Sequence, residues 1–105
     1  MSADYIVVTT TTGDRDVAER IAAHLVTSHA AACVQISGPI ASHYGWNGAH
    51  EQAEEWLCTI KTRAARFHDV RRAIEALHTY DVPEIVAVPM LAASEAYARW
   101  IDAQT

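Results

Sequence analysis

The sequence lacks any long apolar run and any cluster of basic residues. No segment approaches the roughly 20 consecutive apolar residues that a membrane-spanning helix needs, so no transmembrane segment is predicted. Thirteen acidic residues against eight basic ones give a net charge of -5 and a pI near 5.6, and no run of Lys or Arg exceeds a pair. A nucleic-acid partner is therefore not expected, because surfaces that bind nucleic acid gather Lys and Arg on one face.

The sequence also has few cysteines and no sign of a secretory leader. The start, Met1 to Asp4, has neither the positive charge nor the apolar stretch of a signal peptide. The two cysteines are Cys33 and Cys58, and a cytosolic chain of this size normally keeps such thiols reduced. We therefore expect a cytoplasmic protein with two free thiols.

Length and composition predict one folded domain. The chain has 105 residues, of which 50% are hydrophobic and 20% charged, and this balance is typical of a soluble globular domain. The sequence contains no repeats, low-complexity stretches or linkers. A single domain over residues 1–105 is expected.

The spacing of apolar residues predicts the order βαββαβ followed by a short helix. The expected elements are a strand at 5–11, a helix at 14–28, a strand at 32–36, a strand at 54–63, a helix at about 64–77, a strand at 84–89 and a last helix capped by Ser94. Gly38-Pro39 and Asn47-Gly48 punctuate the middle, where a hairpin is expected and residues 42–46 read as a strand end or an ordered loop. This order describes a ferredoxin-like sandwich, an α+β fold with four antiparallel strands and two helices on one face.

Such a fold leaves the second face of its sheet without helices. Alternation within the strands places a mixture of polar and apolar side chains on that face, namely Cys33, Gln35, Glu55, Leu57, Thr59 and Lys61. This mixture suits a face packed on another subunit, so an oligomer is expected. The alternative is a monomer whose sheet is half wet.

The segment from His78 to Pro89 carries the strongest candidate binding groups. His78, Tyr80 and Glu84 offer an imidazole, a phenol and a carboxylate at the mouth of an apolar strand. The structural alternative is that His78 simply ends a helix and that residues 81–83 form a turn. No nucleophile, phosphate loop or cofactor fingerprint accompanies these groups, so an enzyme is not expected.

Five segments together resemble the CutA family of divalent-ion tolerance proteins, nearly end to end. The segments are Ala31-Ala32-Cys33-Val34-Gln35-Ile36, Ser42-His43-Tyr44-Gly45-Trp46-Asn47-Gly48, Glu55 through Lys61-Thr62, His78 to Glu84 with the strand into Pro89, and Tyr97 with Trp100-Ile101. Two positions depart from the family pattern, since Thr79 replaces a common proline and Ala49 a common lysine.

The resemblance implies a ferredoxin-like homotrimer with a ligand cleft between subunits and a role in tolerance of copper and other divalent metals. It implies that the cleft gathers Glu55, Lys61, His78, Tyr80 and Glu84, with Tyr44 and Trp46 nearby. No cofactor is required, although copper or another divalent metal is a candidate ligand. The similarity of this shape to the trimeric PII signalling proteins implies an alternative, a small-molecule sensor or adaptor that binds an organic anion through Lys61 and His78.

The residues themselves point to no preformed metal site within one chain. Copper favours thiolate and imidazole, yet the sequence has no Cys-x-x-Cys, no His-x-His and no histidine pair four residues apart. Cys33 and His78 are the metal-ligand candidates, whereas Cys58 is in phase with the predicted core. Structural roles compete with each of these assignments: Cys33 as interface packing, Tyr44 and Trp46 as interface anchors, and Glu55 and Lys61 as partners in ion pairs between chains.

Overall fold

A computed structural model describes residues 4–105, and its elements follow the predicted order. The N-terminal leader prediction rests on residues 1–4, of which residues 1–3 lie outside the described part. The elements are β1 (Tyr5–Thr12), α1 (Arg15–Thr27), β2 (Cys33–Trp46), β3 (Ala49–Arg63), a 3₁₀ turn (Ala64–Arg66), α2 (Phe67–Leu77), β4 (Val86–Pro89) and α3 (Glu95–Gln104). Ser94 accepts a hydrogen bond from the Tyr97 amide at the start of α3, which confirms the predicted cap.

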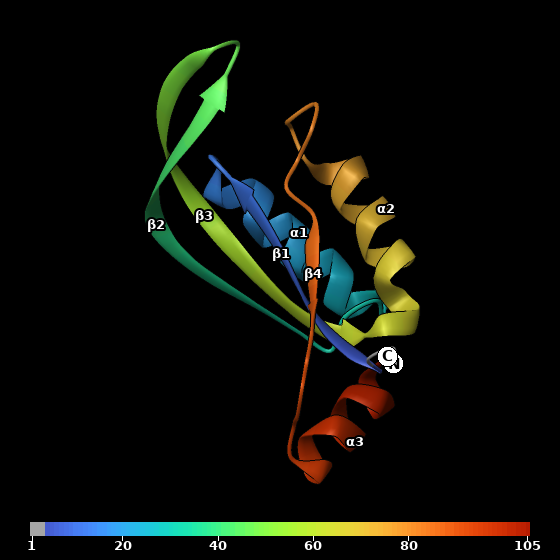
Figure 1. Cartoon of the computed structure of the whole chain (residues 1–105). Coiled ribbons are helices and arrows are strands. Elements are labelled where there is room, and N and C mark those ends of the chain that lie inside the picture. The colour runs from blue at the N-terminus through green and yellow to red at the C-terminus, as the bar shows by residue number, and fades with distance from the viewer. Residues whose placement is uncertain (1–3) are drawn as a thin grey trace.

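The four strands form one antiparallel sheet in the order β2-β3-β1-β4. Figure 1 shows α1 and α2 beside this sheet, with α3 at one end of the molecule and the β2–β3 hairpin at the other. The mixed α+β fold with a four-stranded antiparallel sheet is therefore confirmed. Among the described residues, no helix is long and apolar enough to cross a membrane.

The core lies between the two helices and one face of the sheet. Side chains of β1 and β3 that point to this face are fully buried because α1 and α2 cover them. The fully buried apolar members from the strands and these helices are Val8, Ala18, Ile21, Leu25, Cys58, Ile60, Val70 and Ile74. The alternation predicted for the third strand is thus correct, with Cys58 and Ile60 inside.

The β2–β3 hairpin is much longer than the sequence pattern indicated. Gly38-Pro39 was expected to end the second strand, but it forms a bulge and β2 continues to Trp46. Gly38 has a φ of +152°, and a Cβ there would approach Trp56 Cε3 to 2.8 Å, so glycine is required at this bulge. Residues 42–46 are therefore strand, and they pair with 49–53 across the Asn47-Gly48 turn.

The fourth strand is shorter than predicted. β4 begins at Val86 rather than at Glu84, and its pairing with β1 stops at Thr9↔Val86. The edge of β1 beyond Thr9 is left without a strand partner on this side. The chain between α2 and β4 crosses that edge, and this arrangement creates the candidate site.

Thr10 and Thr62 are both buried on the core face, but replacing each with valine should change the free energy of unfolding in opposite directions. The Thr10 hydroxyl has no hydrogen-bond partner in the part of the chain that the structure describes, whereas the Thr62 hydroxyl donates to the Ala30 carbonyl at 2.7 Å. Thr10→Val should raise the free energy of unfolding, because it removes an unsatisfied buried polar group worth about 1–3 kcal/mol. Thr62→Val should lower the free energy by about 1 kcal/mol, because it removes a donor from a buried carbonyl.

Urea unfolding of the two variants and of the unmodified protein measures both effects. Each substitution conserves shape and both positions are fully buried, so each serves as the control for the other. A loss of stability in Thr10→Val as large as in Thr62→Val would contradict the assignment of the Thr10 hydroxyl as unsatisfied.

Candidate functional site

His78 follows the last residue of α2 and caps the free edge of β1. Its Nε2 lies 2.7 Å from the Thr11 carbonyl oxygen, and its Nδ1 lies 3.1 Å from the Tyr80 amide nitrogen. A carbonyl only accepts and an amide N–H only donates, so these contacts fix a neutral imidazole with its proton on Nε2. Both ring nitrogens are engaged, and the ring satisfies a carbonyl that the short β4 leaves unpaired.

Tyr80 and Glu55 form the second part of the site. The Tyr80 hydroxyl donates to a Glu55 carboxylate oxygen at 2.9 Å, and the Tyr80 and His78 rings lie 4.6 Å apart. Glu55 is only 6% exposed although Tyr80 is 41% exposed, so the tyrosine reaches inward to a nearly buried carboxylate. Gly13 allows this approach, because a Cβ there would lie 3.2 Å from the tyrosine oxygen.

The phenol is held in its neutral form. Burial raises the pKa of Tyr80 above its usual value of 10.0, and the hydrogen bond to the negatively charged Glu55 raises it further. The Gly13 backbone partly offsets this rise, and Tyr44 adds to it. At neutral pH the pair is therefore a phenol donating a hydrogen bond to a carboxylate.

Tyr80→Phe is expected to lower the free energy of unfolding by about 1–3 kcal/mol at pH 7, because the Glu55 carboxylate loses its donor while remaining nearly buried. The folded-state pKa of Tyr80 is raised, so the bond contributes fully below pH 10 and its contribution is lost as the pH rises through the folded-state pKa. Urea unfolding at pH 7 and at pH values above 10 measures the effect. The difference in unfolding free energy between the variant and the unmodified protein should become smaller at the higher pH.

Tyr44→Phe provides the matched control, because Tyr44 is 47% exposed and its hydroxyl has no hydrogen bond to another described residue. Its unfolding free energy should stay within about 0.5 kcal/mol of the unmodified value. Equal stability losses in the two phenylalanine variants would show that the Tyr80–Glu55 bond contributes nothing specific.

Glu84 lies beside this cluster rather than within it. One of its carboxylate oxygens accepts a hydrogen bond from the Thr9 hydroxyl at 2.8 Å. Thr9 is two positions along β1 from Thr11, which His78 contacts. Glu84 therefore extends the line of polar groups along the free edge of β1.

Lys61 and Cys33 lie toward the other end of the sheet. Cys33 is directly opposite Lys61 in the β2–β3 pairing, and the Lys61 ammonium donates to the Gln35 side chain at 3.0 Å. His78 contacts the Thr11 carbonyl, and Thr11 is opposite Leu57 in the β1–β3 pairing. Four residues of β3 therefore separate the two ends, a distance of about 13 Å along the strand. One chain alone does not bring Cys33 or Lys61 to His78.

Tyr44 and Trp46 lie on the part of the β2–β3 hairpin that extends beyond the pairing of β3 with β1. They are 47% and 57% exposed and lie on the same face of β2, since they alternate with Gly45. Tyr44 raises the pKa of Tyr80, and this is the link between the two aromatic residues and the cluster among the described residues. Two exposed aromatic rings on one face have the character of interface anchors.

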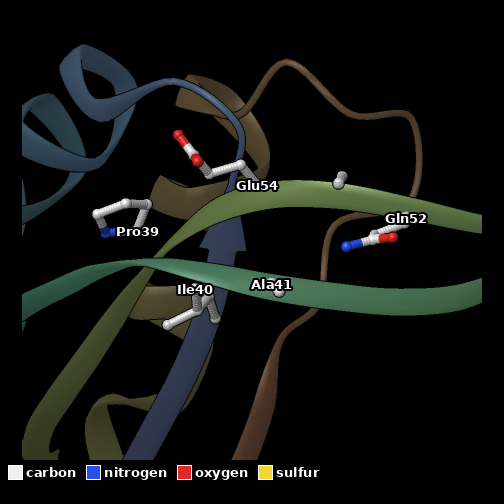
Figure 2. A pocket seen from close by; sticks show the side chains of 6 residues that line it. Pro39, Ile40, Ala41, Gln52 and Glu54 are labelled. Carbon is white, nitrogen blue, oxygen red and sulfur yellow. The ribbon is translucent and has the colours of Figure 1, made fainter.

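A hollow of about 410 Å³ lies on the hairpin next to the cluster. Its lining comes from both strands, with Pro39, Ile40 and Ala41 on β2 and Gln52, Ala53 and Glu54 on β3 (Figure 2). Ile40 is opposite Glu55 in the strand pairing, so the hollow begins where the polar cluster ends. Its lining mixes apolar side chains with one amide and one carboxylate.

The metal-ligand candidates do not form a site within one chain. Residues 4–105 contain no group of three or more His, Cys, Asp or Glu side chains arranged to hold a metal ion. Cys58 is fully buried and burial raises its pKa to about 11, so this thiol is inert packing, as its phase in the strand predicted. Cys33 is partly exposed and lies on the face without helices.

Sequence reasoning missed the partners that hold the cluster together. The Thr11 carbonyl, the Thr9 hydroxyl and the open position at Gly13 all lie in or directly after the first strand, about 65 to 75 residues from their partners. Only the sheet register reveals them, because β1 and β4 are neighbours in space. It also missed a pair of hairpin histidines, His43 and His50, whose ring nitrogens lie 2.9 Å apart.

Comparison with known sequences gives a consistent family match. The family described as "CutA1 divalent ion tolerance protein" matches residues 6–104. The divalent-cation tolerance protein CutA of Archaeoglobus fulgidus is 41% identical over 85 residues, covering 81% of this chain and 82% of that protein. The protein of the same name from Thermus thermophilus is 37% identical over 99 residues, covering 94% and 96%.

A chloroplastic CutA protein of Arabidopsis thaliana is 36% identical over 100 residues, and the match covers 95% of this chain but only 55% of the plant protein. Among solved structures, the CutA1 of Shewanella sp. SIB1 superposes with a TM-score of 0.97 at 31% identity, covering 100% of this chain and 98% of that one. The Thermus thermophilus CutA1 structure gives a TM-score of 0.94 at 37% identity, covering 96% and 98%.

Proposed function

The chain belongs to the CutA1 divalent ion tolerance family, and we propose that it acts as a cytoplasmic homotrimer that binds a divalent cation, copper in the first place, in clefts between subunits. The observation that carries this proposal is the polar cluster of His78, Tyr80 and Glu55 beside the sheet face opposite α1 and α2, where α3 contacts only the end that carries Lys61 and Arg63. The family assignment supports a divalent cation as the ligand, and the cluster is the proposed binding site.

The uncovered sheet face supports assembly. Val86 and Val88 are opposite Thr9 and Val7 and therefore share their face, and both valines are 50% exposed. Leu57 and Thr59 lie on the same face of β3 because they alternate with buried Cys58 and Ile60. An exposed apolar face rimmed by polar groups is typical of a subunit interface. The element order and the strand order support the ferredoxin-like description of each subunit.

Assembly is also what would complete the site. His78 and Cys33 lie at different ends of one sheet, so we propose that a copper ion at the cleft takes Cys33 from one subunit and His78 from its neighbour. Thiolate and imidazole are the ligands that copper prefers. His78 would first release the Tyr80 amide from its Nδ1, because a ring nitrogen that accepts a hydrogen bond has no free lone pair.

A binding role fits the cluster better than an enzymatic one. Both nitrogens of His78 hold backbone groups, so this imidazole is not placed to accept a substrate proton. The raised pKa of Tyr80 keeps its hydroxyl a hydrogen-bond donor. These groups orient a ligand or a neighbouring chain. The cytoplasmic location is part of this proposal, and one relative is named chloroplastic and another periplasmic.

One observation favours a second candidate, the binding of a small organic anion as in PII-like sensors. Lys61 has no acidic partner among the described residues, and its ammonium contacts the Gln35 amide and the face of the Tyr97 ring, 6.0 Å from its centroid. A cation without an acidic partner is available to an anion. In the trimer, Lys61 and His78 of different subunits would together line the cleft.

Copper titration of single variants tests the first candidate. His78→Ala and Cys33→Ser should each weaken cleft copper binding by at least about tenfold, since each removes one ligand. His68→Ala, an exposed histidine on α2, is the matched control and should leave the isotherm unchanged. Unchanged binding in both His78→Ala and Cys33→Ser would remove the cleft as the copper site. A rise in melting temperature caused by an organic anion, and absent in Lys61→Ala, would then favour the sensor.

A further inference from the structure

The histidine pair on the β2–β3 hairpin has no role in the cleft. His43 is on β2, four residues before Asn47, and His50 is on β3, two residues after Gly48. Both side chains are exposed, and the hairpin carries them beyond the sheet, away from the helices (Figure 1). They are the only two histidines whose rings contact one another among residues 4–105.

The strand register explains why these two rings meet. His43 is opposite Gln52 and His50 is opposite Gly45, so the histidines are diagonal neighbours on one face of the hairpin. Gly45 has no side chain, and nothing lies within 4 Å of the position that a Cβ would take there. The space beside His50 is therefore open to His43. The rings stack with centroids 5.1 Å apart and an interplanar angle of 27°.

We propose that His43 and His50 form a surface site for a single divalent transition-metal ion, separate from the cleft between subunits. The nitrogens that face each other are Nδ1 of His43 and Nε2 of His50, at 2.9 Å. In the metal-free pair one nitrogen carries a proton and the other accepts it. Neutral imidazole moves that proton to its second nitrogen by changing tautomer, and this frees two lone pairs for one ion.

The nitrogen separation is compatible with two ligands of one metal ion. With metal–nitrogen bonds of about 2.0–2.1 Å, two nitrogens at right angles around an ion lie about 2.9 Å apart, whereas tetrahedral ligands lie about 3.3–3.4 Å apart. The observed distance is close to the right-angled case, so both nitrogens reach one ion once each ring turns its lone pair away from the other nitrogen and toward the ion. Square-planar or tetragonal sites with nitrogen ligands favour Cu(II) and Ni(II), and Cu(II) binds more tightly.

The site should be weaker than a three-ligand centre and open to water. No third His, Cys, Asp or Glu side chain joins the pair within the described residues. Glu51 is opposite Tyr44 and so lies on the other face of the hairpin. Water would complete the coordination, and an exposed ion of this kind exchanges readily with the surroundings.

Cu(II) titration of the tag-free, full-length protein tests the proposal in a background that lacks the cleft ligands, Cys33→Ser/His78→Ala. The background protein should bind one Cu(II) per chain, with electron paramagnetic resonance showing imidazole nitrogen ligands. Adding His43→Ala or His50→Ala should each weaken this binding by at least about tenfold. Adding His24→Ala, an exposed histidine on α1, is the matched control and should change nothing.

Two results would overturn the hairpin site. One is a background protein that binds no Cu(II), which would leave the cleft as the copper site if the unmodified protein binds it. The other is binding in the His43→Ala and His50→Ala variants that equals the His24→Ala control. Conversely, copper binding that is unchanged in Cys33→Ser/His78→Ala but is lost when His43→Ala is added would support the hairpin site and count against the cleft. The two proposals therefore fail independently.

Discussion

If the chain forms the proposed trimer, Val88→Glu is expected to give monomers that keep their fold. Val88 is 50% exposed in the single chain and lies opposite Val7 on the sheet face that α1 and α2 leave uncovered. A carboxylate there stays hydrated in a monomer, but assembly would bury it among apolar side chains without a partner. The penalty for burying an unpaired charge is several kcal/mol, which is enough to dissociate a trimer at micromolar concentration. Sedimentation velocity measures the change in mass, and circular dichroism checks the fold.

Val26→Glu is the matched control for this experiment. Val26 is also a half-exposed valine, at 42%, but it lies on α1, away from the uncovered sheet face. The control should assemble like the unmodified protein. If Val88→Glu also remains assembled, this sheet face is not the interface and the cleft proposal loses its basis.

Ile60→Ala is expected to lower the free energy of unfolding by about 2–5 kcal/mol, because it leaves a cavity in a closely packed core. Ile60 is fully buried on β3, where it packs with residues of α1 and α2. Because α2 delivers His78 to the edge of β1, weakening this contact also loosens the site. Urea unfolding at one fixed protein concentration measures the effect, since the stability of an oligomer depends on concentration.

Thr59→Ala provides the comparison at the adjacent position. Thr59 points to the opposite face of the same strand and is only partly buried in the single chain. Its substitution should cost less than about 1 kcal/mol, because it empties no space in the core. Equal losses at the two positions would mean that the helix-covered face is not the main source of stability.

The element order and the core of this protein follow from local patterns in the sequence. Val17, Ile21 and Leu25 recur at the four-residue spacing that is typical of a helix, and they are buried in α1. On β3, buried Cys58 and Ile60 alternate with Leu57 and Thr59, as expected of a strand with one buried face. These predictions succeed because burial of apolar side chains follows the 3.6-residue and 2-residue periods directly. The family resemblance, drawn from short segments in order, is confirmed by the match over residues 6–104.

The hairpin and the site were harder to predict because both depend on pairing between distant or irregular segments. Gly38-Pro39 is typical of a strand end, and only the sheet shows that the strand passes through it as a bulge. The sequence singles out His78, Tyr80 and Glu84 as candidate binding groups, yet their partners Thr11, Glu55 and Thr9 depend on the register. The His43–His50 contact depends on a diagonal pairing across the hairpin, which the spacing of the two residues in the sequence does not predict.

Native mass spectrometry of the reduced His43→Ala/His50→Ala protein, titrated with Cu(II) and then anaerobically with Cu(I), tests the cleft between subunits most directly. This variant removes the hairpin ligands, so any stoichiometric copper reports on the cleft. We predict a trimer that takes up copper in a fixed ratio and loses it when His78→Ala or Cys33→Ser is added. A protein that is monomeric at micromolar concentration, or a trimer that binds no copper, would contradict the proposal of a copper cleft between subunits.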